Sequence, residues 1–176
     1  MMKKLLALSV LAFVAVAPSV QAQRSHRPVE FGVDAGVTFG LDDPNLTVVS
    51  IPVQDFRVGF LMSDDIALEP RMHLNSIHGD GGSITSYAFE LGVVWTPGGD
   101  RVGKGLYGRP FLGVAGANIT DFGSDNNGFA GLGVGLKIPF SDRRLATRME
   151  ANYTHGFGSG DSNAIALLIG LSFFTR

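Results

Sequence analysis

Two pairs of opposite charges stand two residues apart in segments where polar and apolar residues alternate. Glu69 and Arg71 form one pair, and Arg148 and Glu150 form the other. Residues two apart in an extended strand point to the same face, so each pair places an acid beside a base. Such pairs can form the selectivity filter of a channel, or a buried ion-pair network that fills a narrow lumen. A small barrel is just wide enough for its own side chains, which favours the network.

A second candidate for chemistry is His155, which is followed by Ser159 and Ser162. A nucleophilic serine needs a base within hydrogen-bond reach and a further group that orients this base. Both serines fall in a glycine-rich segment, and the final predicted strand has no Asp or Glu to orient the imidazole. We therefore expect no catalytic centre.

The composition excludes several other classes of site. The chain has no Cys, which excludes a disulfide framework, a thiolate zinc site and a cysteine nucleophile. Its formal charge of -2 gives no basic footprint for nucleic acid. One group of oxygen-bearing side chains does not match the spacing of a calcium-binding EF-hand: Asp121, Asp125, Asn126 and Asn127. We expect neither a metal nor a cofactor.

The first 22 residues have the pattern of a cleaved signal peptide. Lys3 and Lys4 precede an apolar run over residues 5–17, Pro18 ends this run, and small residues around Ala22 provide a cleavage site. The apolar run is too short to span a bilayer comfortably. We predict an exported protein whose mature chain, residues 23–176, forms one domain.

Eight segments of the mature chain alternate with a period of two, which is typical of β-strands. Each has about the ten residues that a tilted transmembrane strand needs. The segment at 49–60 changes parity, and either a bulge near Gln54 or a strand that starts late would explain this change. The eight predicted strands cover residues 29–40, 49–60, 66–75, 87–95, 106–117, 130–140, 145–154 and 165–173.

The two faces of these strands differ in charge. One face is apolar and carries no charge, as lipid requires, because an Arg there would cost about 2–4 kcal/mol. A soluble lipocalin-like carrier shows the same alternation with its faces reversed. The abundance of glycine on the polar face and the aromatic residues near strand ends favour a membrane barrel. The polar face, expected to line the lumen, carries Glu30, Asp34, Asp55, Arg57, Glu69, Arg71, Glu90, Arg109, Lys137, Arg148 and Glu150.

The strand at 106–117 is apolar or small on both faces, and the predicted connections differ in character. In this strand we place Pro110, Leu112 and Val114 outward, and Phe111, Gly113 and Ala115 inward. Tight turns are predicted at 62–65 and 141–144, and a longer connection with a Pro-Gly-Gly-Asp turn signal at 96–105. Four polar loops, at 41–46, 76–83, 118–128 and 155–163, are expected to face outside the cell.

The order and spacing of these features resemble the small eight-stranded outer-membrane β-barrel family of the OmpA and OmpX type. The resemblance rests on the signal peptide, LEPRMHL at 68–74, GRPFLGVAGAN at 108–118, RMEANYTH at 148–155 and the closing GLSFF at 170–174. It implies insertion into a Gram-negative outer membrane by the barrel-assembly machinery, with outer-membrane lipid and lipopolysaccharide around the barrel. In this family an aromatic residue usually ends the chain, whereas here Thr175 and Arg176 follow the last aromatic residue, so we expect Leu171 and Phe173 to carry the C-terminal assembly signal.

The sequence thus predicts an all-β protein, an eight-stranded antiparallel up-and-down transmembrane barrel. We expect a monomer with a structural or surface-interaction role and no enzymatic activity. Two alternatives stay open at this point. One is a hydrolase that modifies lipid A, built around His155, and the other is a soluble lipocalin-like carrier in the periplasm.

Overall fold

The computed structural model describes residues 28–42, 47–79, 82–98, 104–119, 123–140, 144–158 and 161–175. The predicted signal peptide and its cleavage site lie outside these residues. Among the described residues, no helix is both long enough and apolar enough to cross a membrane.

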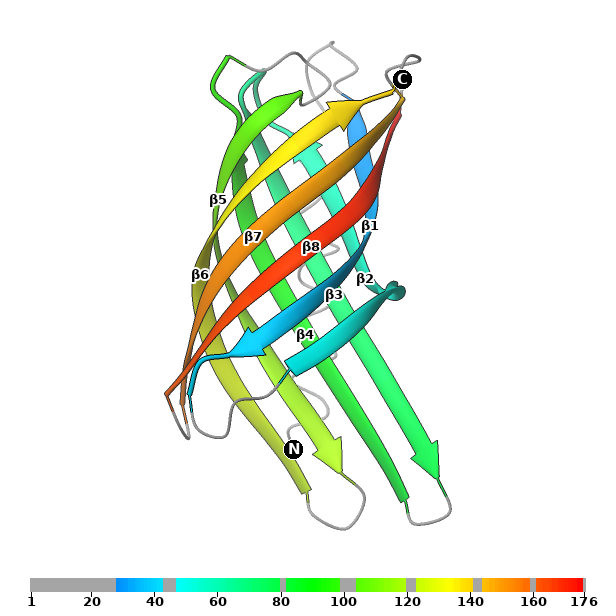
Figure 1. Ribbon diagram of the computed structural model, residues 1–176, viewed down its shortest axis with the longest axis vertical. Coiled ribbons are helices and arrows are strands. Elements are labelled where there is room, and N and C mark those ends of the chain that lie inside the picture. The colour runs from blue at the N-terminus through cyan, green and yellow to red at the C-terminus, as the bar shows by residue number, and fades with distance from the viewer. Residues whose placement is uncertain are drawn as a thin grey trace, which may run out of the picture.

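The described chain forms a closed barrel in which each strand pairs with the next and β8 pairs with β1 (Figure 1). Every pairing is antiparallel, because short connections join consecutive strands. The predicted eight-stranded up-and-down barrel is confirmed. Its strands are β1 (Val29–Gly40), β2 (Thr47–Leu61), β3 (Ile66–Gly79), β4 (Gly82–Trp95), β5 (Gly105–Ile119), β6 (Gly123–Pro139), β7 (Leu145–Phe157) and β8 (Ser162–Phe174).

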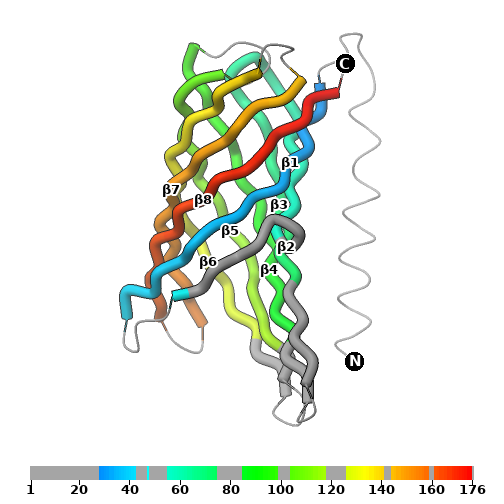
Figure 2. The backbone as a smooth tube through the Cα atoms, turned by 45° about the vertical axis from the view of Figure 1, so that its right-hand side comes forward, coloured from blue at the N-terminus to red at the C-terminus, as the bar shows by residue number. Residues whose placement is uncertain are grey.

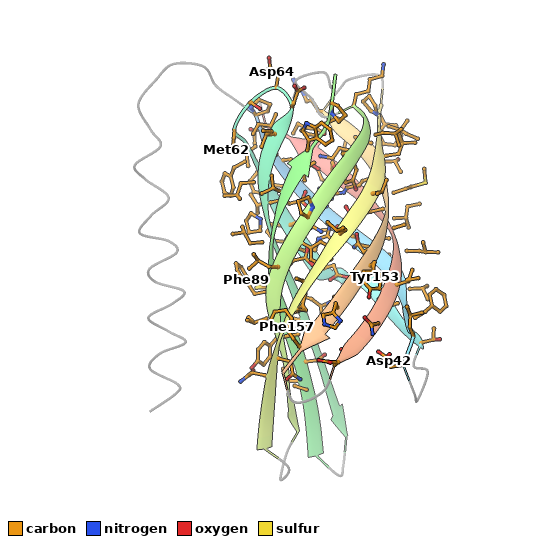
Figure 3. All side chains as sticks on the ribbon, turned by 90° about the vertical axis from the view of Figure 1, so that its left-hand side faces the viewer. Asp42, Met62, Asp64, Phe89, Tyr153 and Phe157 are labelled. Carbon is orange, nitrogen blue, oxygen red and sulfur yellow. The ribbon has the colours of Figure 1, made fainter. Side chains whose placement is uncertain are left out.

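The barrel has two distinct ends. We call the end with the connections at 62–65, 96–104 and 140–144 the turn end, and the opposite end the loop end. Val29 pairs with Thr175 through two hydrogen bonds, so the first and last described strands meet at the turn end. Figure 2 shows β1 beside β8 along this seam. In Figure 3, Met62 and Asp64 mark the turn end, and Asp42 lies toward the loop end.

The barrel wall is apolar outside and polar inside. Leu112, Leu132 and Val134 are more than 60% exposed on the outer face, whereas Arg57 and Glu69 are fully buried inside. Side chains cover the outside of the ribbon in Figure 3. A soluble carrier needs the reverse polarity, so its surface is incompatible with this wall. The exterior is that of a protein embedded in lipid.

The structure also resolves the two strands in which the sequence pattern was irregular. Asp34 of β1 pairs with Asp55 of β2, but Gly36 pairs with Ser50, so β2 has extra residues between these two pairs. This confirms an irregularity next to Gln54. In β5, Pro110, Leu112 and Val114 are exposed, whereas Phe111 is buried, as predicted.

Two predicted loops were wrong in their bounds. The segments at 76–83 and 118–128 are rich in Gly, Ser, Asn and Asp, which favour turns. In the structure, β3 pairs with β4 as far as Gly79 and Gly82, and β5 pairs with β6 as far as Ile119 and Gly123. A continuous ladder of cross-strand pairs outweighs the weak local preference of these residues. As a result, the two hairpins project beyond the other strands at the loop end (Figure 1).

Candidate functional site in the charged lumen

The eleven charged residues that the sequence placed on the polar face all belong to strands of the barrel. Nine of them are buried, and Asp55 and Glu90 are half-buried. The β8 strand contributes no charge to this set but places the buried hydroxyl of Ser172 among them. The interior of the barrel is therefore a layer of ionised groups contributed by seven strands.

Arg148 lies at the centre of this layer. Its guanidinium donates hydrogen bonds of 3.1 Å to Glu69 Oε1 and to Glu150 Oε2. Two further guanidinium groups approach Glu150 Oε1, Arg71 at 3.2 Å and Arg109 at 3.4 Å. Each carboxylate thus receives several donors, which buried carboxylates need in order to stay ionised.

A second part of the layer surrounds Glu30 near the turn end. Its carboxylate accepts hydrogen bonds from Arg57, from Lys137 and, at 2.7 Å, from Ser172 Oγ. Arg57 also donates to Asp34 Oδ2 at 2.8 Å, and its Nη1 lies 3.8 Å from Glu69 Oε2. Arg57 therefore connects the Glu30 group to the central group, which makes one continuous network.

Aromatic rings complete the network, and the sequence analysis did not single them out. The Tyr107 hydroxyl donates to Glu150 Oε2 at 2.5 Å, and the guanidinium carbon of Arg148 lies 4.6 Å from the centre of the Tyr107 ring. A Cβ added at Gly135 would overlap this ring, so glycine there leaves the space that Tyr107 occupies. Two features of the sequence could have indicated this role. Tyr107 has the same parity as the inward Arg109, and the next strand, β6, is rich in glycine on its inward face.

His73 is a further residue that the sequence reasoning missed. Its Nδ1 lies 2.8 Å from Asp55 Oδ1, and the two residues are cross-strand partners on β3 and β2. Both side chains are partly exposed, unlike the nine buried charged residues of the network. The pair lies on the side of the network that faces the loop end.

The arrangement is that of a filled lumen. The network residues Glu69, Arg109 and Arg148 are each no more than 1% exposed, so their side chains exclude solvent from the level of the barrel that they occupy. Each has an oppositely charged partner. This geometry favours a structural network over a selectivity filter, which needs charges exposed to a water path.

A conductance measurement tests this interpretation. In planar bilayers, we expect the purified monomer to give no conductance of porin size and at most rare small openings, because an eight-stranded barrel leaves no room beside its own side chains. A 16-stranded porin in the same bilayer serves as the positive control. Steady large channels from the monomer would contradict the filled lumen.

The His155 group lies elsewhere, near the loop end. His155 is exposed, and its Nδ1 lies 3.1 Å from Asn163 Oδ1. The side chain of Asn163 donates in turn to Asp42 at 3.3 Å, so an amide orients the imidazole although the last strand has no acid. Ser162 has the same parity as the inward residues of β8, so it points to the opposite face from His155. Ser159 lies outside the described residues. Among the described residues, the hydroxyl next to His155 is therefore not that of a serine but that of Tyr153, which donates to the same Asn163 Oδ1 at 2.6 Å.

Comparison with known proteins identifies the fold. No protein-family model matches the chain, and no curated protein matches it. Among solved structures, the N-terminal barrel domain of OprF from Pseudomonas aeruginosa matches with a TM-score of 0.51 and 19% identity, over 85% of this chain and 100% of that one. Neisserial surface protein A matches with a TM-score of 0.56 and 11% identity, over 82% and 96%. OprG from P. aeruginosa matches with 0.50 and 13%, over 85% and 95%. The chain thus has the fold of the small outer-membrane barrels.

Proposed function

We propose that this outer-membrane β-barrel is a non-catalytic protein that presents a sheet at the cell surface for interaction with other molecules. The charged network fills its lumen and supports the wall. The part that interacts is the extension of the β3–β4 and β5–β6 hairpins beyond the other strands. We propose that the protein works as a monomer and needs no cofactor.

The observation that carries this proposal is the pairing of the strands in the extension. In the described register, β2 pairs with β3 no further toward the loop end than His73, whereas β3 continues to Gly79. On the other side, β7 pairs with β6 only from Gly128, whereas β6 begins at Gly123. Pairing between β4 and β5 continues to Ile84 and Ile119. The extension is therefore a four-stranded sheet, and β3 and β6 form its edges.

An open sheet edge offers unpaired backbone donors and acceptors to an incoming strand. Such edges bind extended peptides by strand addition, with affinity from backbone hydrogen bonds. The orientation of the barrel supports this role, because its first and last strands meet at the turn end, and a barrel with an even number of strands and both termini in the periplasm has its loop end outside the cell. We therefore place the extension outside the cell.

Shortening both hairpins tests the proposed role. One change joins Asn75 to Ser86 and the other joins Ala115 to Asn127, each through an Asn-Gly turn that matches the twist of a two-residue hairpin. Random peptides displayed on phage are selected against the parent barrel in lipid nanodiscs. We expect the selected peptides to be extended and poor in proline, and to lose binding to the shortened barrel.

The shortened barrel should still migrate differently on gels before and after boiling, since the network that holds the wall is intact. If it binds the selected peptides like the parent, the extension is not the interaction surface. A structural role would give a different pair of results. The parent would select no peptides, and deletion of the gene would make cells permeable to hydrophobic dyes. The shortened protein would then restore the barrier. Release of fatty acid from lipopolysaccharide by the purified parent would instead favour the hydrolase alternative.

A further inference from the structure

The outer wall of the barrel has a groove of about 660 Å³. It crosses five neighbouring strands, from β5 through β6, β7 and β8 to β1. Cross-strand partners line it in rows, and one row runs from Val134 to Ala151, Leu167 and Val37. The residues of this row belong to the outward parity of their strands and are flanked by inward residues such as Gly135 and Leu168, so the row faces the lipid.

Small side chains form the floor of the groove. Ala151 lies between Val134 and Leu167, and Ala35 pairs with Ile169 in the next row. Leu106 and Leu167 are 67% and 55% exposed, so their side chains stand above this floor. This shallow, open depression is bordered by apolar side chains, which fits a hydrocarbon chain lying along the wall.

One end of the groove lies beside a cationic part of the turn end. Leu106 is the second residue of β5, and the exposed Lys104 directly precedes this strand. Arg144, also exposed, directly precedes β7, which contributes Met149 to the groove. The other end reaches Val37 and Leu167, near the loop end of β1 and β8. The groove therefore descends into the membrane from a rim with positive charge.

We infer that this groove holds one acyl chain of an anionic phospholipid from the leaflet at the turn end, with the phosphate at Lys104. The occupant follows from the two observations together: the apolar groove selects a chain, and the cation at its rim selects a negative headgroup. Lysine side chains near a membrane surface attract anionic lipid in this way. This site is independent of the proposed surface role, because none of the groove residues belongs to the projecting part of the hairpins, and the phosphate lies at the turn end.

Quenching of tryptophan fluorescence by brominated lipids tests the site in the full-length protein in bilayers. Trp95 is the single tryptophan of the chain. In a Trp95→Phe background, Leu106→Trp reports on the groove, and Phe60→Trp reports on the turn end of β2, across the barrel. We expect brominated phosphatidylglycerol to be preferred over brominated phosphatidylcholine at the Leu106→Trp reporter only. Equal preference at both reporters would mean ordinary boundary lipid and would overturn the inference.

Variants separate the two parts of the site. Lys104→Gln should lower the preference for phosphatidylglycerol about five-fold, the value of one basic residue near a membrane surface. Ala151→Leu should fill the groove and abolish the preference, whereas the matched change Ala130→Leu on the outer face of β6, outside the groove, should not alter it. If Ala151→Leu leaves the preference unchanged, the groove does not hold the chain. Efficient cross-linking between two Ala151→Cys protomers, with no lipid preference, would show that a second copy occupies the groove instead.

Discussion

Replacing Arg148 with alanine is expected to lower the free energy of unfolding of the barrel by about 3–5 kcal/mol, the usual cost of breaking a buried ion pair. Arg148 bonds to both Glu69 and Glu150 and is 1% exposed. Its removal leaves these carboxylates with fewer donors in an interior of low dielectric constant. Most of the cost arises because two buried carboxylates then keep their charge without the guanidinium that balances it.

The measurement is urea unfolding of the protein in lipid vesicles, followed by the fluorescence of Trp95. Arg144→Ala is the matched control, because Arg144 is exposed at the turn end and its loss should cost less than about 1 kcal/mol. Equal and small effects at the two positions would show that Arg148 is not part of a buried network.

A double variant covers the case in which Arg148→Ala does not fold at all. Arg148→Met together with Glu150→Gln removes a positive and a negative charge and keeps the volume of both side chains. Because the charge balance of the network is then unchanged, we expect this variant to be more stable than Arg148→Met alone. A double variant that is less stable than the single one would contradict this explanation.

The fold could be predicted because a membrane barrel requires every strand to alternate apolar residues that face lipid with residues that face the lumen. Val33 and Asp34 illustrate it, since one faces lipid and the next is buried. Repeated in each strand, this alternation sets the number of strands and their faces. It also assigned the charged residues to one face, since no charge is tolerated on the other.

Other features depend on contacts between distant segments and could not be predicted. Tyr107 belongs to the network because the glycine opposite it leaves space for its ring, a relation between β5 and β6. The orientation of His155 by Asn163 and Asp42 likewise requires the closure of β1 against β8. The projecting hairpins were missed because local composition favours turns where cross-strand pairing extends the strands.

Replacing Phe173 with alanine is expected to reduce the amount of folded protein in the outer membrane several-fold. Leu171 and Phe173 are 42% and 47% exposed on the outer face of β8, near its end. Aromatic rings are favoured at the membrane interface. Phe174 faces inward and is buried, so Phe173 is the last aromatic residue on the lipid side of the strand. If the assembly machinery recognises a lipid-facing aromatic residue in the last strand, that residue is Phe173.

The effect on assembly has to be separated from a loss of stability. Phe140 also lies on the outer face at the turn end, with 48% exposure, but it follows β6. Phe140→Ala removes the same ring from the same interface, so it should cost similar stability while assembly stays near normal. The measured quantity is the heat-modifiable fraction in outer-membrane preparations. If Phe173→Ala assembles like Phe140→Ala, the assembly signal lies elsewhere.

Changes at the residues after Phe173 provide a second test of the assembly signal. Thr175 bonds to Val29 through its backbone N–H at 2.9 Å and accepts the Val29 N–H on its hydroxyl at 2.8 Å, so it closes the seam between the two end strands. Thr175→Phe keeps the backbone bond, loses the hydroxyl acceptor and places a ring where the resembled family ends its chain. We expect assembly equal to or better than that of the parent, and rescue of Phe173→Ala when the two changes are combined, because the recognised ring is restored at the next position of the same parity. Deletion of Arg176 should have little effect.

Failure of Thr175→Phe to rescue would mean that Phe173 acts through its own packing against Phe31 and Leu145, its cross-strand partners, and not as a signal.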